Sequence, residues 1–107
     1  MRPNLGEFEE LVLLAVCACN DEAYGVSVQE VIESRTERRP SLSAVHTALY
    51  RLQEKGYLIS ELGGATRERG GRRKRLFSVT DAGKSAVIEA RNAREQLWRV
   101  IADPVFN

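Results

Sequence analysis

The sequence predicts a mainly α-helical fold with one small β-hairpin and a long C-terminal helix. Up to residue 55, apolar side chains recur at helical spacing. After Gly56, two short segments rich in aromatic and branched residues replace that spacing, as strands do. Helical spacing returns from Thr80. The chain has 107 residues, 43% hydrophobic and 29% charged. It therefore has the length of one compact domain and the composition of a globular protein.

Two helices are expected in the first forty residues. The first covers about residues 5–19, with Asn4 as its N-cap and Glu7 reaching back in a capping box. The second covers about residues 25–37, because Pro40 disfavours helical geometry in the residue before it.

The third helix, about residues 42–55, has the clearest boundaries. Ser41 is a natural N-cap, and Gly56 supplies the left-handed residue that ends many helices. Four apolar residues follow the i, i+3, i+4, i+7 rule and should face the core: Val45, Ala48, Leu49 and Leu52.

Residues 57–62 and 75–79 should pair as an antiparallel hairpin. The glycine-rich, basic loop between them is longer than ordinary hairpin loops, and such loops are usually functional or disordered. Thr80 then caps a helix that continues to about residue 102, a length of about 35 Å at ~1.5 Å per residue.

Three helices followed by a hairpin form a winged helix-turn-helix. The second and third helices are the helix-turn-helix, and the hairpin is the wing. In such proteins the second helix of the helix-turn-helix, here the third helix of the chain, enters the DNA major groove. Residues 1–79 would be the DNA-binding unit, and residues 80–107 a dimerisation helix. The third helix carries polar side chains opposite its apolar face, which can bond to base edges or phosphates. These candidates are Ser43, His46, Thr47, Tyr50 and Arg51. The same pattern also fits a helix face that is simply solvated.

Positive charge is concentrated in the middle of the chain. Residues 41–79 carry eight basic and three acidic side chains, whereas residues 1–40 carry four basic and eight acidic ones. Cationic side chains that neutralise phosphates release counterions, and arginine enters narrow minor grooves. The hairpin candidates for DNA contact are Arg67, Arg69, Arg72, Arg73 and Lys74. Outside this architecture, such a run would be a solvated stretch of charge.

Four segments resemble successive blocks of PadR-family transcriptional regulators: LGEFEELVLLAV, AYGVSVQEVIE, LSAVHTALYRLQEKGYL and GGRRKRLFSVTDAG. The resemblance covers about residues 5–83. It implies a dimeric repressor that binds double-stranded DNA at a near-palindromic operator. Tyr24, in the AYG block, should pack with its hydroxyl near a phosphate. The chain departs from the family at His46, where the family commonly has tyrosine.

The last helix carries an apolar stripe that one small domain cannot easily cover. Burial against the first helix and against the same helix of a second subunit would cover it. Together with the neighbouring Trp98, the candidate dimer interface comprises Ala86, Ala90, Ala93, Leu97 and Ile101. Trp98 would be an interface anchor or, as in drug-binding relatives, would line a pocket for a small aromatic effector.

The sequence contains no recognisable catalytic set, phosphate-binding loop or Cys/His spacing for a metal, so we expect neither an enzyme nor a cofactor. Cys17 and Cys19 should be free thiols. No signal peptide or membrane-length apolar run is visible, which predicts a cytoplasmic protein. The alternative function is a winged-helix protein-interaction module that never contacts DNA and docks through its acidic first third.

Overall fold

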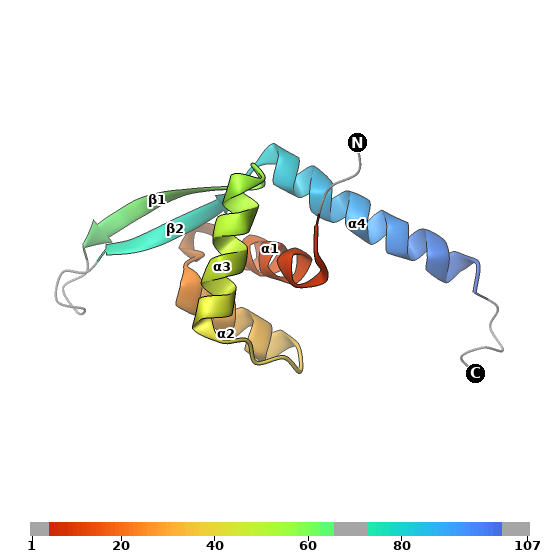
Figure 1. The fold of residues 1–107 in the computed structure, drawn as a ribbon, viewed down its shortest axis with the longest axis horizontal. Helices are drawn as coiled ribbons and strands as arrows, with labels where there is room; N and C mark the ends of the chain where they lie inside the picture. The colour runs from red at the N-terminus through yellow and green to blue at the C-terminus, as the bar shows by residue number, and fades with distance from the viewer. Residues whose placement is uncertain (1–4, 66–72, 102–107) are drawn as a thin grey trace.

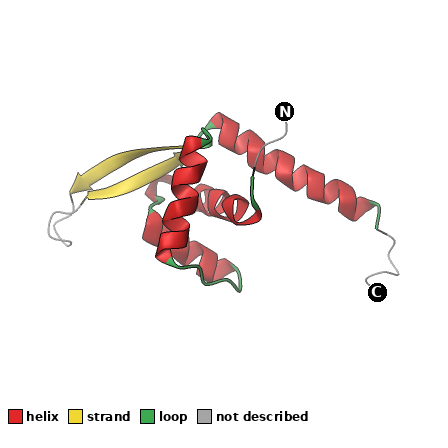
Figure 2. Cartoon of the chain, viewed as in Figure 1, coloured by secondary structure: helices red, strands yellow, loops and turns green. Residues whose placement is uncertain are grey.

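The computed structural model describes residues 5–65 and 73–101. Figures 1 and 2 show a core of helices from which a two-stranded hairpin and a long helix extend on opposite sides. This arrangement confirms the predicted mainly α fold with one hairpin. The elements are α1 (Glu7–Cys19), the short 3-10 helix η1 (Asn20–Glu22), α2 (Gly25–Arg35), α3 (Leu42–Glu54), β1 (Leu58–Ala65), β2 (Arg73–Val79) and α4 (Asp81–Arg99).

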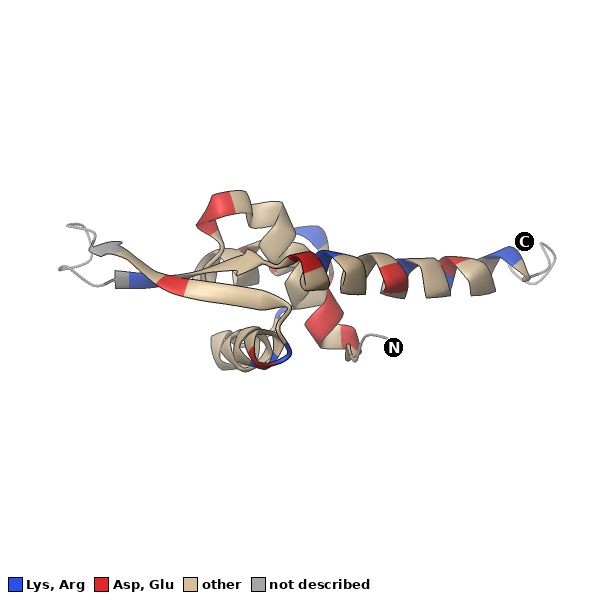
Figure 3. Cartoon of the chain, turned by 90° about the horizontal axis from the view of Figure 1, so that it is seen from above, with Lys and Arg blue, Asp and Glu red and all other residues tan. Residues whose placement is uncertain are grey.

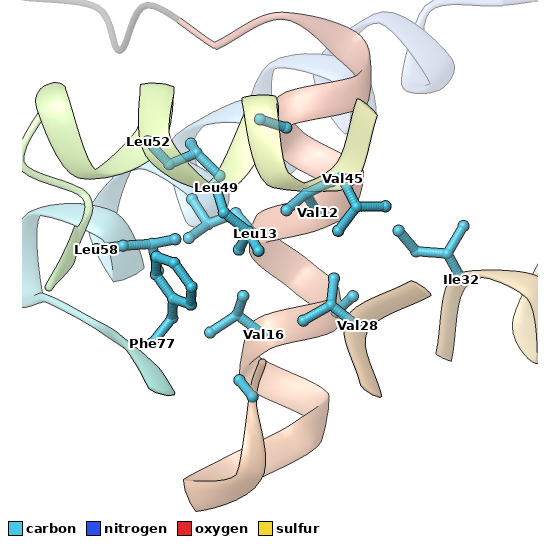
Figure 4. Close-up of a cluster of buried hydrophobic side chains, with 13 residues drawn as sticks. Val12, Leu13, Val16, Val28, Ile32, Val45, Leu49, Leu52, Leu58 and Phe77 are labelled. Carbon is cyan, nitrogen blue, oxygen red and sulfur yellow. The ribbon is translucent and has the colours of Figure 1, made fainter. Parts of the chain in front are cut away.

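The core lies where α1, α2 and α3 meet the base of the hairpin. Figure 4 shows the side chains of α1 between those of α3, α2 and the two strands. All four apolar residues predicted to face inward from α3 are buried, because their spacing places them on one side of that helix. The largest fully buried side chains are Val12, Leu13, Val16, Val28, Ile32, Val45, Leu49, Leu52 and Leu58.

The expected N-terminal boundary of α1 was wrong by two residues. The helix begins at Glu7 with Gly6 as N-cap, and the Gly6 N–H donates to Oε1 of Glu9 at 2.8 Å. The predicted cap residue Asn4 lies outside the described residues. The same Glu9 carboxylate, rather than that of Glu7, is the one that reaches back to the cap.

An ion pair joins α1 to the end of α3. Lys55 Nζ lies 2.6 Å from Oε1 of Glu9, whose side chain is only 12% exposed. Burial by itself raises the pKa of Glu9, but the hydrogen bonds from Lys55 and the Gly6 N–H outweigh it. The net effect is a pKa below the usual value for glutamate.

The second helix ends at Arg35, two residues before the predicted end. Thr36 adopts an extended backbone, and its hydroxyl donates to the Ile32 carbonyl at 2.7 Å. The same carbonyl also accepts the Thr36 N–H at 2.9 Å, so Thr36 bonds to the last turn of α2 twice. The chain then runs to Ser41, which caps α3 as predicted by accepting the Ala44 N–H at 3.1 Å.

The strands pair in the predicted antiparallel sense but are longer than the sequence indicated. The register runs from Leu58 opposite Val79 to Leu62 opposite Arg75, and continues after an irregularity to Ala65 opposite Arg73. The extra residues GGA and RK have little strand propensity of their own. Cross-strand pairing, which a propensity scale does not contain, keeps them extended.

Hydrogen bonds fasten the base of the hairpin to the helices. The Phe77 N–H donates to the Ala23 carbonyl at 2.8 Å, just before α2. The Thr80 N–H donates to the Tyr57 carbonyl at 3.0 Å, and the Thr80 hydroxyl donates to the Gly56 carbonyl at 2.7 Å. The hairpin therefore leaves the core in a direction fixed by both α2 and the end of α3.

Helix α4 begins as predicted, with the Thr80 hydroxyl accepting the Gly83 N–H at 3.0 Å. Its first turns pack on the core, and Arg94 Nη1 lies 2.5 Å from Oε1 of Glu10 on α1. The rest of the helix projects away from α1–α3 (Figures 1 and 3). None of the described helices is sufficiently long and apolar to cross a bilayer.

Candidate nucleic-acid interface

The polar side chains that the sequence singled out on α3 all lie on its exposed side. They are Ser43, His46, Thr47, Tyr50 and Arg51. Thr47 donates its hydroxyl proton to the Ser43 carbonyl at 2.9 Å, which leaves the lone pairs of its oxygen available to an outside donor. The buried apolar side of the same helix fixes the direction in which these groups point.

The imidazole of His46 lies against the first turn of α2. A Cβ atom at Gly25 would lie 2.2 Å from Nε2 of His46, so only glycine leaves room for the ring in this position. The rings of His46 and Tyr50 have centroids 6.5 Å apart, and Tyr50 meets Phe77 edge-on at 5.8 Å. The start of α2, the middle of α3 and strand β2 therefore meet at one place.

The wing adds a cation at this meeting point. Lys74 Nζ lies 4.1 Å from the centroid of the Tyr24 ring, a cation–π distance. Both residues are half-buried. Between α2, α3 and β2 lies a hollow of about 200 Å³, lined by Tyr24, Gly25, Val26, His46, Tyr50, Lys74, Arg75 and Phe77. We call these eight residues the wing hollow; none of them is acidic.

The remaining basic candidates lie at or beyond the ends of the described strands. Arg67, Arg69 and Arg72 lie outside the described residues, and Arg73 begins β2 with its backbone opposite Ala65. Figure 3 shows basic residues at the outer end of the hairpin, with an acidic residue further along the other strand.

Arg75 is a wing-hollow residue that the candidate list for DNA contact omitted. Its side chain shares a face of β2 with the buried Phe77, two residues later. The alternation of strand side chains could have revealed this. The predicted strand 75–79 already included Arg75, but the cationic candidates were chosen for their charge and not for the strand face on which they lie.

On α4, the predicted interface residues differ in how much their own chain covers them. Ala86 is buried, Ala90 and Ile101 are half-buried, and Ala93, Leu97 and Trp98 are exposed. Among the described residues, no group of three or more His, Cys, Asp or Glu side chains could hold a metal ion. Both thiols are free cysteines.

The family model described as "Transcriptional regulator PadR-like family" matches residues 13–89, which run from the middle of α1 through α2, α3 and the hairpin to the middle of α4. The chain belongs to this family. A curated relative of this PadR-like protein is the transcriptional regulator Rv3488 of Mycobacterium tuberculosis. It is 33% identical over 84 residues, which cover 78% of this chain and 74% of the relative.

Solved structures of similar fold include two PadR-like regulators. One, from Bacteroides fragilis, has a TM-score of 0.71 at 19% identity, covering 86% of this PadR-like chain and 84% of that one. The other, from Bacillus cereus, has a TM-score of 0.72 at 15% identity. The match covers 94% of this chain and 92% of that one. They bear out the winged-helix fold with a C-terminal helix. The family and the relative are named as regulators of transcription, not as enzymes.

Proposed function

We propose that this PadR-like regulator binds double-stranded DNA as a homodimer and represses transcription from a near-palindromic operator. Residues 1–79 would form the DNA-binding unit, with α3 in the major groove and the wing on the backbone or in the minor groove. One observation carries the proposal: His46 and Tyr50 of α3 and Lys74 of the wing line the same hollow. A single polyanion can therefore contact both elements at once.

The charges around the wing hollow favour a phosphate-rich partner. Lys74 and Arg75 are its two charged side chains. Each phosphate that a cation neutralises releases condensed counterions, which favours binding at low salt. The further candidates Arg67, Arg69, Arg72 and Arg73 would extend the same effect along the backbone. Base selection would come from Ser43, Thr47 and Arg51, whose donors and acceptors match base edges.

The dimer would form through residues 80–107, the segment that contains α4. Leu97, Trp98 and Val100 near its end are 67%, 61% and 78% exposed, and Ile88 and the α1 residue Leu14 are also large and exposed. Exposed apolar side chains that lie together mark protein interfaces, and we infer that a second subunit covers those near the end of α4. A two-fold axis there would place two copies of α3 about 34–36 Å apart, one turn of DNA.

The DNA-binding proposal is tested with the duplex that the parent protein selects from a random-sequence pool. The double variant Arg72→Ala/Arg73→Ala should bind more weakly, and the magnitude of the slope of log K against log salt should fall by about 3.6, because each subunit of the dimer loses two phosphate contacts at ~0.9 each. Lys84→Ala, on α4, is the control and should behave as the parent. An unchanged affinity and slope in the double variant would refute the wing's role. A parent that binds no duplex would favour the protein-interaction module.

The dimer is tested by sedimentation equilibrium. Leu97→Glu should shift the protein towards monomer, because it places a charge in the proposed apolar interface. Asn92→Glu adds the same charge at another exposed α4 position and should leave the dimer intact. A parent that sediments as a monomer would contradict this part of the proposal.

Trp98 would anchor the interface or line a small aromatic-effector site between subunits. The fluorescence of Trp98 in the presence of aromatic compounds distinguishes these two roles. Quenching by members of a panel of aromatic compounds would support an effector site, whereas no response would leave the anchor role alone.

A further inference from the structure

A chain of side-chain hydrogen bonds joins α3 to both strands of the wing. The Ser60 hydroxyl, on β1, donates to Oε1 of Gln53 in the last turn of α3. Arg75 Nη1, on β2, donates to Oγ of Ser60 at 3.1 Å. All three residues are half-buried. The chain therefore connects three separate elements at a place where water only partly competes.

Proton counting fixes the direction of this chain. A guanidinium has five N–H donors and no acceptor, so the Ser60 oxygen must accept from Arg75. The single hydroxyl proton of Ser60 is then left for the amide oxygen of Gln53. Serine serves because its hydroxyl accepts and donates at once, and Arg75 keeps its other N–H donors for a further partner.

The strand register explains why Arg75 points towards the helices. Ser60 lies opposite Phe77, and Leu62 lies opposite Arg75, so Ser60 and Arg75 are diagonal neighbours across the ladder. Phe77 is buried in the core, and Arg75 shares its face of β2. Arg75 is also one of the residues that line the wing hollow, together with Tyr50 of α3.

We propose that Arg75 contacts a DNA phosphate and that Ser60 and Gln53 are positioning residues that hold its guanidinium beside the exposed face of α3. The inference rests on the proposed DNA-binding function. A guanidinium matches a phosphate with two parallel N–H bonds, but only when its plane is suitably oriented. A side chain that is already ordered loses less conformational entropy on binding. The Arg75–Ser60 and Ser60–Gln53 hydrogen bonds should therefore improve affinity, although Ser60 and Gln53 do not contact DNA.

The test is a double-mutant cycle on duplex binding, again with the duplex selected by the parent. Arg75→Ala should weaken binding and lower the magnitude of the salt slope by about 1.8, because each subunit of the dimer loses one phosphate contact. Ser60→Ala keeps every charge and should weaken binding about 2- to 10-fold for each subunit of the dimer, the range for losing the order of one long side chain. In the Arg75→Ala background, Ser60→Ala should have no further effect, because there is no guanidinium left to position.

Two further variants separate positioning from folding. Ser60→Thr retains the hydroxyl and should restore parent-like affinity, whereas Gln53→Leu should resemble Ser60→Ala. Thermal unfolding at matched protein concentration checks that each variant is folded. Arg75→Lys keeps the charge without the planar fork and should bind more weakly than the parent at an unchanged slope.

The outcomes are distinguishable. A parent that binds no duplex overturns the proposed function together with this inference. A parent that binds, with Arg75→Ala matching it in affinity and slope, overturns this inference alone. An equal loss from Ser60→Ala with and without Arg75 would show that Ser60 supports the fold rather than the guanidinium, and would also overturn it.

Discussion

Among the glycines that the structure describes, Gly83, in the first turn of α4, is where a single added methyl group should be most harmful. It is buried, and a Cβ atom there would lie 2.3 Å from the Tyr57 carbonyl oxygen and 2.8 Å from Cγ2 of Val79. The carbonyl is backbone and cannot rotate away. It also accepts the Thr80 N–H at 3.0 Å, a bond that fastens α4 to the base of β1.

The expected cost of Gly83→Ala follows from these contacts. Overpacking of this kind costs about 1–3 kcal/mol, and weakening the Thr80–Tyr57 bond costs about 0.5–1.5 kcal/mol. Replacing glycine in a helix offsets up to about 1 kcal/mol. We therefore expect a net loss of about 2 kcal/mol, which lowers Tm by about 8–16 °C in a domain of this size.

The same substitution at Gly25 is the matched comparison. There the added Cβ would lie as close to another atom, 2.2 Å, but that atom is Nε2 of His46, at the end of an exposed side chain. Gly25 is itself buried, but the imidazole can rotate into solvent, so Gly25→Ala should cost about 1 kcal/mol or less, below the loss at Gly83.

Thermal and urea unfolding at one fixed protein concentration measure both variants, since the stability of an oligomer depends on concentration. A Gly83→Ala protein that unfolds at the parent's midpoint would refute the reasoning. So would equal losses in the two variants, because the argument depends on whether the obstructing atom belongs to backbone or side chain.

Three further predictions concern stability and thiol chemistry. Because the folded pKa of Glu9 is lowered, its ionised form stabilises the protein above the usual glutamate pKa, and this contribution disappears as pH falls through the folded value. Glu9→Gln should therefore cost about 0.5–2 kcal/mol at pH 7 by urea unfolding, with the difference vanishing in acid; a constant difference across pH would contradict this. Leu13→Ala should lower unfolding free energy by about 2–5 kcal/mol, because Leu13 is fully buried in the core, and a loss below about 1 kcal/mol would mean that the site collapses around the cavity. Cys17 is exposed, but desolvation by the neighbouring chain raises the pKa of its thiol. In a Cys19→Ala protein, its alkylation at neutral pH should be slower than that of an unstructured thiol, and equal rates would argue against the shift.

The sequence by itself determined which residues of the helices face inward. The spacing of Val45, Ala48, Leu49 and Leu52 fixed the buried side of α3 and, by difference, the side that carries His46 and Tyr50. Ser41 and Gly56 fixed the ends of that helix, and the change of period after Gly56 marked the hairpin. These features are local, because periodicity and caps depend on neighbours within a turn or two.

Only the tertiary structure decided which exposed groups come together. Gly25 and His46 are 21 residues apart in the sequence, and Tyr24 and Lys74 are 50 apart, yet each pair is in contact. The link from Gln53 through Ser60 to Arg75 likewise depends on strand register and on how the hairpin leaves the core. The periodicity of a helix or strand predicts that a side chain is exposed, but not which residues of other elements lie beside it. Those contacts depend on how the whole chain packs.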